Sequence, residues 1–252
     1  MRISKPKNTT FENCHFDNSI STFPNPAFVA GASIGGMENG NFISCTFNGS
    51  RCIGSSLGVQ FGPGTTQDLP PKSGKNVRFI SCTANDIQQI RNLQLPAPVL
   101  TTNSQALGYF IIGIKNLIFE NCTAQDIVTN GPISTNGGAI GWQIQSGSDV
   151  APEFATDNLI LKGCVASRIT TVNGGAAQGF GFFAVGPNTA LRTVLFQDCV
   201  CEGNLALIPT LTVNPVTGAP YNNVQGTAVG FNFTRSQDGG EEFPATDING
   251  KA

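Results

Sequence analysis

The feature that most constrains the fold is a short phrase that returns six times, each time around a cysteine. It reads NFISCTF around Cys45, NVRFISCTA around Cys82 and NLIFENCTA around Cys122. Successive cysteines are between 31 (14 to 45) and 42 (122 to 164) residues apart. A repeat of this period indicates one supersecondary unit stacked on itself. We expect six coils, centred on Cys14, Cys45, Cys82, Cys122, Cys164 and Cys199.

Apolar residues alternate around each of these cysteines, and alternation predicts strands, because neighbouring side chains leave opposite faces. Three residues before the cysteine stand Phe11, Phe42, Phe79, Phe119, Leu161 and Phe196. Two residues after it stand Phe16, Phe47, Ala84, Ala124, Ala166 and Cys201. The first apolar residue stands three positions before the cysteine rather than two, and this step of three interrupts the alternation. Two short strands are therefore predicted to meet at a bend just before the cysteine. Turn-forming residues occupy this position: Asn13, Ser44, Ser81, Asn121, Gly163 and Asp198.

A second phrase lies between the cysteine phrases and predicts a third strand in each coil. It begins with a glycine and continues with large apolar residues at every second position, as in Gly141-Trp142-Gln143-Ile144. No segment shows a sustained helical period. Three short strands per coil, with inserted loops, describe an all-β fold, a parallel β-helix of about six coils. We expect right-handed winding, because crossovers between parallel strands strongly prefer that hand.

A column of asparagines supports stacking of the coils in register. Six residues before the cysteines stand Asn8, Asn39, Asn76, Asn116, Asn158 and Thr193. Asparagines at equivalent bends can hydrogen-bond to one another in a ladder, and they tolerate the unusual dihedral angles of a bend. The alternative is that asparagine is simply a common turn residue.

Taken together, these motifs resemble the repeats of the pectate-lyase-like superfamily of right-handed parallel β-helices, of the type with cysteine and asparagine ladders. The resemblance covers nearly the whole chain. It implies the fold but no particular activity, because that superfamily contains lyases, hydrolases, phage spikes, adhesins and inert scaffolds.

Composition restricts the possible partners. Residues 1–252 are expected to form a single domain, with residues 235–252 as a C-terminal tail. Only 12% of the residues are charged and the net charge is −2, so a nucleic-acid partner is not expected. We also expect no membrane span, since there is no apolar run of 18 residues. No N-terminal stretch resembles a signal peptide.

Eight cysteines raise the question of disulfides or a metal site. Side chains in one inward column point the same way rather than at each other, which disfavours bridges between neighbours. We therefore interpret the column as buried free thiols. With one histidine and no CxxC pair, neither a metal nor another cofactor is expected. Cys52 fits none of the columns.

One charged column is a candidate site. Four residues after three successive cysteines stand Asp86, Asp126 and Arg168. Stacked carboxylates about 5 Å apart with an arginine beside them could bind a polysaccharide or cleave it as a lyase or glycoside hydrolase. The alternative, which we favour, is a surface ladder at a turn, since no other polar group converges there.

The two ends of the repeat provide the main functional hypothesis. The first strand of the cysteine phrase begins near residue 7, and the tail echoes the start of a further coil. Either the chain is excised from a longer β-helix, or the last coil of one copy stacks on the first coil of the next. The residues expected at such a contact are Asn8, Phe11, Cys14, Phe231 and Phe233.

We therefore expect a non-catalytic structural or interaction protein whose main partner is itself, assembled head to tail or laterally. Apolar loops at 88–106 and 204–225 could add lateral contacts. An extracellular, cell-surface or virion-associated location is favoured. The alternative function is a carbohydrate-active or carbohydrate-binding module.

Overall fold

The computed structural model describes residues 1–21, 28–62, 74–90, 105–130, 138–146, 156–172, 175–184, 192–207, 226–235 and 248–251. These residues form strands β1 to β21, and the described part of the chain contains no helix. It accordingly contains no helix that could cross a membrane.

The strands form three parallel sheets, here called sheets A, B and C. Sheet A consists of β1 (Arg2–Ser4), β4 (Phe28–Gly35), β7 (Ser55–Gly62), β10 (Ala106–Ile112), β13 (Gly138–Ser146), β16 (Gly175–Ala184) and β20 (Gly226–Arg235). Sheet B consists of β2 (Lys7–Glu12), β5 (Glu38–Ile43), β8 (Gly74–Ile80), β11 (Ile114–Glu120), β14 (Asp157–Lys162), β17 (Arg192–Gln197) and β21 (Ile248–Lys251). Sheet C consists of β3 (Ile20–Ser21), β6 (Arg51–Cys52), β9 (Thr83–Gln89), β12 (Thr123–Thr129), β15 (Val165–Thr171) and β18 (Val200–Glu202), with β19 (Leu205–Ala206) also pairing with β15.

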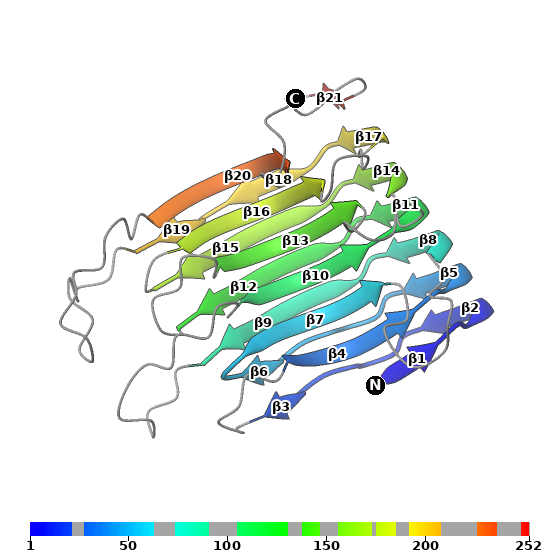
Figure 1. The fold of residues 1–252 in the computed structure, drawn as a ribbon, viewed down its shortest axis with the longest axis horizontal. Coiled ribbons are helices and arrows are strands. Elements are labelled where there is room, and N and C mark those ends of the chain that lie inside the picture. The colour runs from blue at the N-terminus through cyan, green and yellow to red at the C-terminus, as the bar shows by residue number, and fades with distance from the viewer. Residues whose placement is uncertain are drawn as a thin grey trace.

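The chain visits sheets A, B and C in turn, and every pair of neighbouring strands is parallel, so the fold is a parallel β-helix (Figure 1). The predicted fold class is confirmed. Sheets A and B each hold seven strands, because β1 precedes the first cysteine phrase and β21 follows the last one. Ile3 of β1 is opposite Ile34, so β1 adds a further member to the apolar column of the second phrase.

Three bends in each coil have left-handed backbone angles, which explains the residue types found there. The bend near the start of each sheet B strand has φ of 49–57° at the asparagine column, from Asn8 to Asn158 and at Thr193. The bend before the cysteine has φ of 51–60°. A third, inside sheet C, comes four residues after the cysteine, with φ of 53–70°. Asparagine, aspartate and glycine adopt this conformation at the lowest cost.

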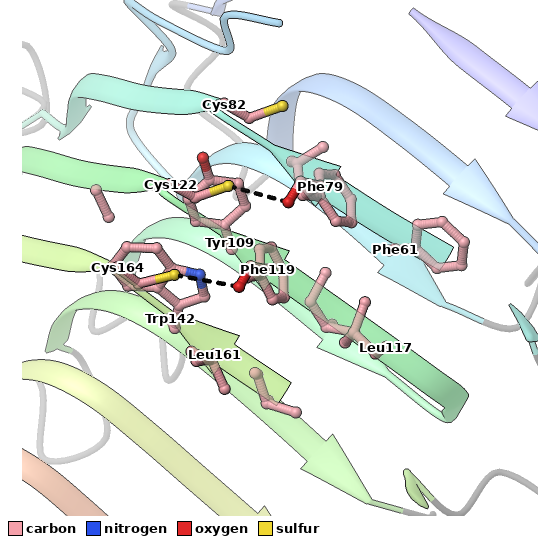
Figure 2. Packing of buried hydrophobic residues seen from close by; sticks show 14 of the residues in the cluster. Phe61, Phe79, Cys82, Tyr109, Leu117, Phe119, Cys122, Trp142, Leu161 and Cys164 are labelled. Carbon is pink, nitrogen blue, oxygen red and sulfur yellow. Dashed lines mark hydrogen bonds between the residues drawn. The ribbon is translucent and has the colours of Figure 1, made fainter. Parts of the chain in front are cut away.

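The core consists of columns in which equal residues stack along the helix axis (Figure 2). Phe79 stacks on Phe42 and on Phe119, with ring centroids 4.7 and 4.8 Å apart. In the facing sheet, Trp142 stacks on Tyr109 and on Phe180, at 5.0 and 4.7 Å. These rings are fully buried, as the inward positions predicted.

Small residues keep sheets A and C close together. A Cβ atom on Gly108 would lie 2.6 Å from the carbonyl oxygen of Gly141 and 3.0 Å from the Cβ of Ala124. The same contacts recur one coil earlier, where Gly58 faces Gly108 and Ala84. The glycine of the second phrase and the alanine after the cysteine are therefore two sides of one close approach.

Insertions occur at two of the three corners. Between sheets C and A, the connection is 53–54 in one coil and 90–105 in the next. Between sheets A and B it also varies, from residue 113 alone to residues 236–247. Between sheets B and C, the bend and cysteine always follow the strand directly, without insertion.

Several predicted loops are shorter than the sequence suggested. Residues 88–89 belong to β9, and residues 205–206 form β19, so the two apolar loops begin later than expected. The rest of these loops, 91–104 and 208–225, lies outside the described residues. Within the predicted tail, 235–252, Arg235 is the last residue of β20 and Ile248–Lys251 forms β21.

Candidate functional sites

The charged column lies at the left-handed bend of sheet C. Asp86, Asp126 and Arg168 have φ of 57°, 53° and 53°. Arg168 donates to both carboxylate oxygens of Asp126, from Nε at 2.6 Å and from Nη2 at 2.7 Å. Asp86 instead accepts from Arg51 Nη2 of the preceding coil at 2.6 Å, and from the Gln88 amide. The two carboxylates therefore have separate partners rather than a shared site.

The electrostatics of this column do not resemble those of a glycosidase carboxyl pair. The hydrogen bond from Arg168 lowers the pKa of Asp126. A general acid at neutral pH needs a raised pKa instead. The arrangement is that of two partly exposed ion pairs, each linking one coil to the next.

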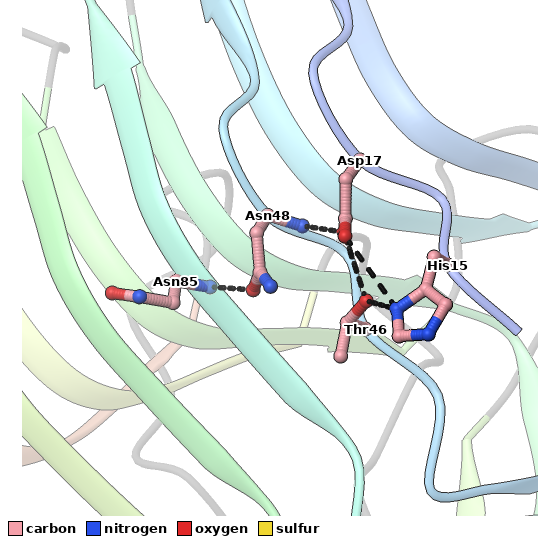
Figure 3. Close-up of polar contacts among 5 residues, drawn as sticks. All are labelled: His15, Asp17, Thr46, Asn48 and Asn85. Atoms are coloured by element: carbon pink, nitrogen blue, oxygen red, sulfur yellow. Dashed lines mark hydrogen bonds and ion pairs between the residues drawn. The ribbon is translucent and has the colours of Figure 1, made fainter. Parts of the chain in front are cut away.

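A second polar cluster, which the sequence phrases did not indicate, links the first coil to the second (Figure 3). The Thr46 hydroxyl donates to Asp17, whose carboxylate oxygens lie 2.9 and 3.0 Å away, and lies 2.8 Å from His15 Nδ1. Asp17 also accepts from the backbone N–H of Asn48 at 2.7 Å, and the Asn48 amide oxygen accepts from the N–H of Asn85 at 3.0 Å.

This cluster occupies the outward positions one and three residues after the cysteine. His15 pairs with Thr46 and Thr46 with Thr83 as successive residues of one column. Alignment of the columns on both sides of the cysteine would have revealed the cluster. Its hydrogen bonds hold neighbouring coils together, because the Thr46 hydroxyl of the second coil contacts both His15 and Asp17 of the first.

The cysteine column is reduced, as expected, and all eight cysteines are free thiols. Each interior thiol donates to the carbonyl oxygen of the residue three before the cysteine in the preceding coil. Cys82 donates to Phe42 at 3.3 Å. Figure 2 shows the equivalent bond one coil further on, in which Cys122 donates to Phe79 at 3.4 Å. Burial raises the pKa of Cys45 to about 11, which keeps this thiol protonated and unreactive at neutral pH.

The structure also places Cys52. It stands seven residues after Cys45, opposite Ser21 and Gln89 in sheet C, and its sulfur accepts from the N–H of Gly54. Within the described residues, no three His, Cys, Asp or Glu side chains converge as a metal site made only of such ligands would require.

At the first coil, the predicted contact residues are less covered than their equivalents inside the helix. Asn8 is exposed, and Phe11 and Cys14 are partly exposed, whereas Phe42 and Cys45 are fully buried. The Phe11 ring stacks on Phe42 with centroids 5.0 Å apart. Strands β1, β2 and β3 stand at the edges of sheets A, B and C in the described part of the chain.

At the opposite end, Phe231 stacks on Phe180 at 4.8 Å and remains 39% exposed. Phe233 pairs with Phe182 through its backbone, and its side chain lies outside the described residues. The exposed large hydrophobic residues of the described chain all lie in the first two or last two coils: Met1, Ile20, Phe28, Leu195, Val200, Leu205, Leu207 and Phe231.

Comparison of the chain with protein-family models, with curated proteins and with solved structures finds no match in any of the three.

Proposed function

We propose that this protein is a non-catalytic structural β-helix that associates with further copies of itself through its end coils. We also propose that its fold belongs to the pectate-lyase-like superfamily. The observation that carries this proposal is the distribution of exposed large hydrophobic residues, which, among the residues that the structure describes, lie in the first two and the last two coils. The repeated columns with cysteine and asparagine ladders support the superfamily assignment.

Edge strands and exposed rings make the end coils suitable for association. An edge strand presents unpaired backbone groups that act as a template for another strand. At the first coil these strands surround Ile3, Phe11 and Cys14, which pack on the core cluster. An additional coil would cover both the backbone groups and the apolar columns, in the way that each interior coil covers its neighbour.

The charged column supports no second proposal. A carbohydrate-active site at Asp86, Asp126 and Arg168 would need at least one carboxylate available to substrate. Each of the two carboxylates is instead bound by an arginine of a neighbouring coil.

Light scattering of the purified chain over a wide concentration range tests the proposal. We expect assembly to grow with concentration and Phe11→Asp to abolish it, because Phe11 lies in a column that a further coil would cover. The matched control is Thr10→Asp, in the same strand but with an exposed, outward side chain. A monomeric unmodified chain at every concentration, or equal loss in both variants, would contradict the proposal.

A further inference from the structure

We infer that His15, Asp17 and Thr46 form a surface site for one divalent transition-metal ion. The ligand atoms are an imidazole nitrogen and a carboxylate oxygen of the first coil and a hydroxyl oxygen of the second coil. This inference goes beyond the proposed self-association and does not rest on it.

The three ligand atoms lie at distances that suit a single ion (Figure 3). Thr46 Oγ1 lies 2.8 Å from His15 Nδ1 and 2.9 Å from Asp17 Oδ2, and the nitrogen and the carboxylate oxygen are 3.7 Å apart. Three atoms at these separations lie on a circle of about 1.9 Å radius, so one point is about 2.1 Å from each of them, the usual length of a metal bond to nitrogen or oxygen. Neighbouring ligands of an octahedral ion at that distance are about 3.0 Å apart. The three atoms can therefore occupy one face of the coordination shell.

The stacking of the two coils holds the ligands in place. The Thr46 N–H donates to the Cys14 carbonyl at 2.9 Å, and Thr46 and His15 pair as neighbours in one column. The carboxylate of Asp17 is oriented by the backbone N–H of Asn48, which donates to Oδ1 at 2.7 Å. A hydrogen bond of this kind, from a group that does not itself touch the metal, is what fixes a ligand in known metal sites.

The carboxylate of Asp17 is available to a cation. Asp86 and Asp126 are each bound by an arginine, whereas the only ion pair that Asp17 makes among the described residues is with His15. The side chain of His15 is 71% exposed and that of Asp17 is 25% exposed. An ion can therefore reach the site from solvent, and water can complete its coordination.

Binding would also change which ring nitrogen of His15 carries the hydrogen. The Thr46 hydroxyl donates to Asp17, so in the absence of an ion Nδ1 of His15 must donate to Thr46. A nitrogen that binds a metal cannot carry a hydrogen, so in the bound state the hydrogen is on Nε2. The state of this ring is a direct reporter of the site.

The next coil has the same geometry without the same chemistry. Thr83 pairs with Thr46, and Asn48 stands where Asp17 stands in the first coil. This second set has neither an imidazole nor a carboxylate. Calcium and magnesium prefer oxygen ligands, whereas an imidazole suits zinc, nickel and related ions. The presence of His15 therefore favours a transition metal.

The experiment is a titration of the purified chain, with its thiols reduced, with Co²⁺. His15 is the only histidine, so the imidazole signals in an NMR spectrum report on this site alone. We expect one Co²⁺ per chain, a shift of the imidazole signals, and an absorption spectrum without the intense band of a cobalt–thiolate bond. The midpoint of thermal unfolding should rise with Co²⁺ concentration, because the unfolded chain has no such site.

Three variants remove one ligand each: His15→Gln, Asp17→Asn and Thr46→Val. Loss of a group that only orients a ligand typically weakens metal binding by about 10–100-fold, so loss of the Asp17 carboxylate should weaken Co²⁺ binding at least that much. His15→Gln and Thr46→Val should also weaken it. The matched control is Thr83→Val, which removes the equivalent hydroxyl one coil further on and should leave the affinity unchanged. Circular dichroism without metal checks that each variant is folded.

Three results would overturn the inference: a cobalt–thiolate band, unchanged affinity in any folded ligand variant, or equal weakening by Thr46→Val and Thr83→Val. Self-association is measured without metal, so its failure leaves the metal site intact. Failure of the metal site likewise leaves self-association intact.

Discussion

At the scale of single residues, the left-handed bends explain the asparagine column better than the ladder alone does. A left-handed backbone costs an ordinary L-residue about 1–2 kcal/mol, and asparagine less. The ladder adds hydrogen bonds on an exposed edge, such as those that Asn116 makes to Asn76 and Asn158. Thr193 keeps the bend, with φ of 51°, without an amide to extend the ladder.

Two substitutions at Asn116 separate these contributions. Asn116→Ala should lower the free energy of unfolding by about 2–3 kcal/mol, because it strains the bend and removes both ladder bonds. Asn116→Gly keeps the bend and should cost about 1 kcal/mol less. Urea unfolding of the two variants and the unmodified chain measures the difference. Equal losses in the two variants would mean that the bend carries no strain.

At the scale of strands and connections, the sequence predicted the part of each coil that cannot vary. The segment from the asparagine to the second residue after the cysteine contains two left-handed bends and the inward columns, so it repeats without insertion. Cys52 was not placed, because it belongs to a column with mixed residue types. Ile3 was not placed, because β1 lacks the glycine that marks the second phrase. The partner of Asp86 was also missed, since Arg51 stands two positions away from the aligned charged column.

The corners should differ accordingly in their tolerance of insertion. Two glycines inserted after Ser81 should lower the midpoint of thermal unfolding by roughly 10 °C, because they move Cys82 and the following strand out of register. The same two glycines after Ile53 lengthen a connection that is much longer in the next coil, and loop closure costs only about 0.6 kcal/mol per doubling of length. Thermal unfolding followed by circular dichroism compares them. Similar midpoints would contradict the assignment of a fixed corner.

At the scale of the whole molecule, a solenoid is held together by contacts between neighbouring coils only. The contribution of a core residue to the free energy of unfolding should therefore depend on whether its coil has one neighbouring coil or two. Phe119 and Phe11 occupy the same column and test this directly. Phe119 is fully buried between Phe79 and Leu161, whereas Phe11 has Phe42 on one side and is partly exposed.

Phe119→Ala should lower the free energy of unfolding by about 3–5 kcal/mol, the usual cost of truncating a buried phenylalanine. Phe11→Ala should cost roughly half as much in the dilute, unassembled protein, because part of its ring surface is already in contact with water. Its cost should rise at concentrations where the end coils are covered by another copy. Urea unfolding at low and high protein concentration measures both effects. A full loss for Phe11→Ala at low concentration would show that the first coil is already covered within a single copy, and the end coils would then be closed to a partner.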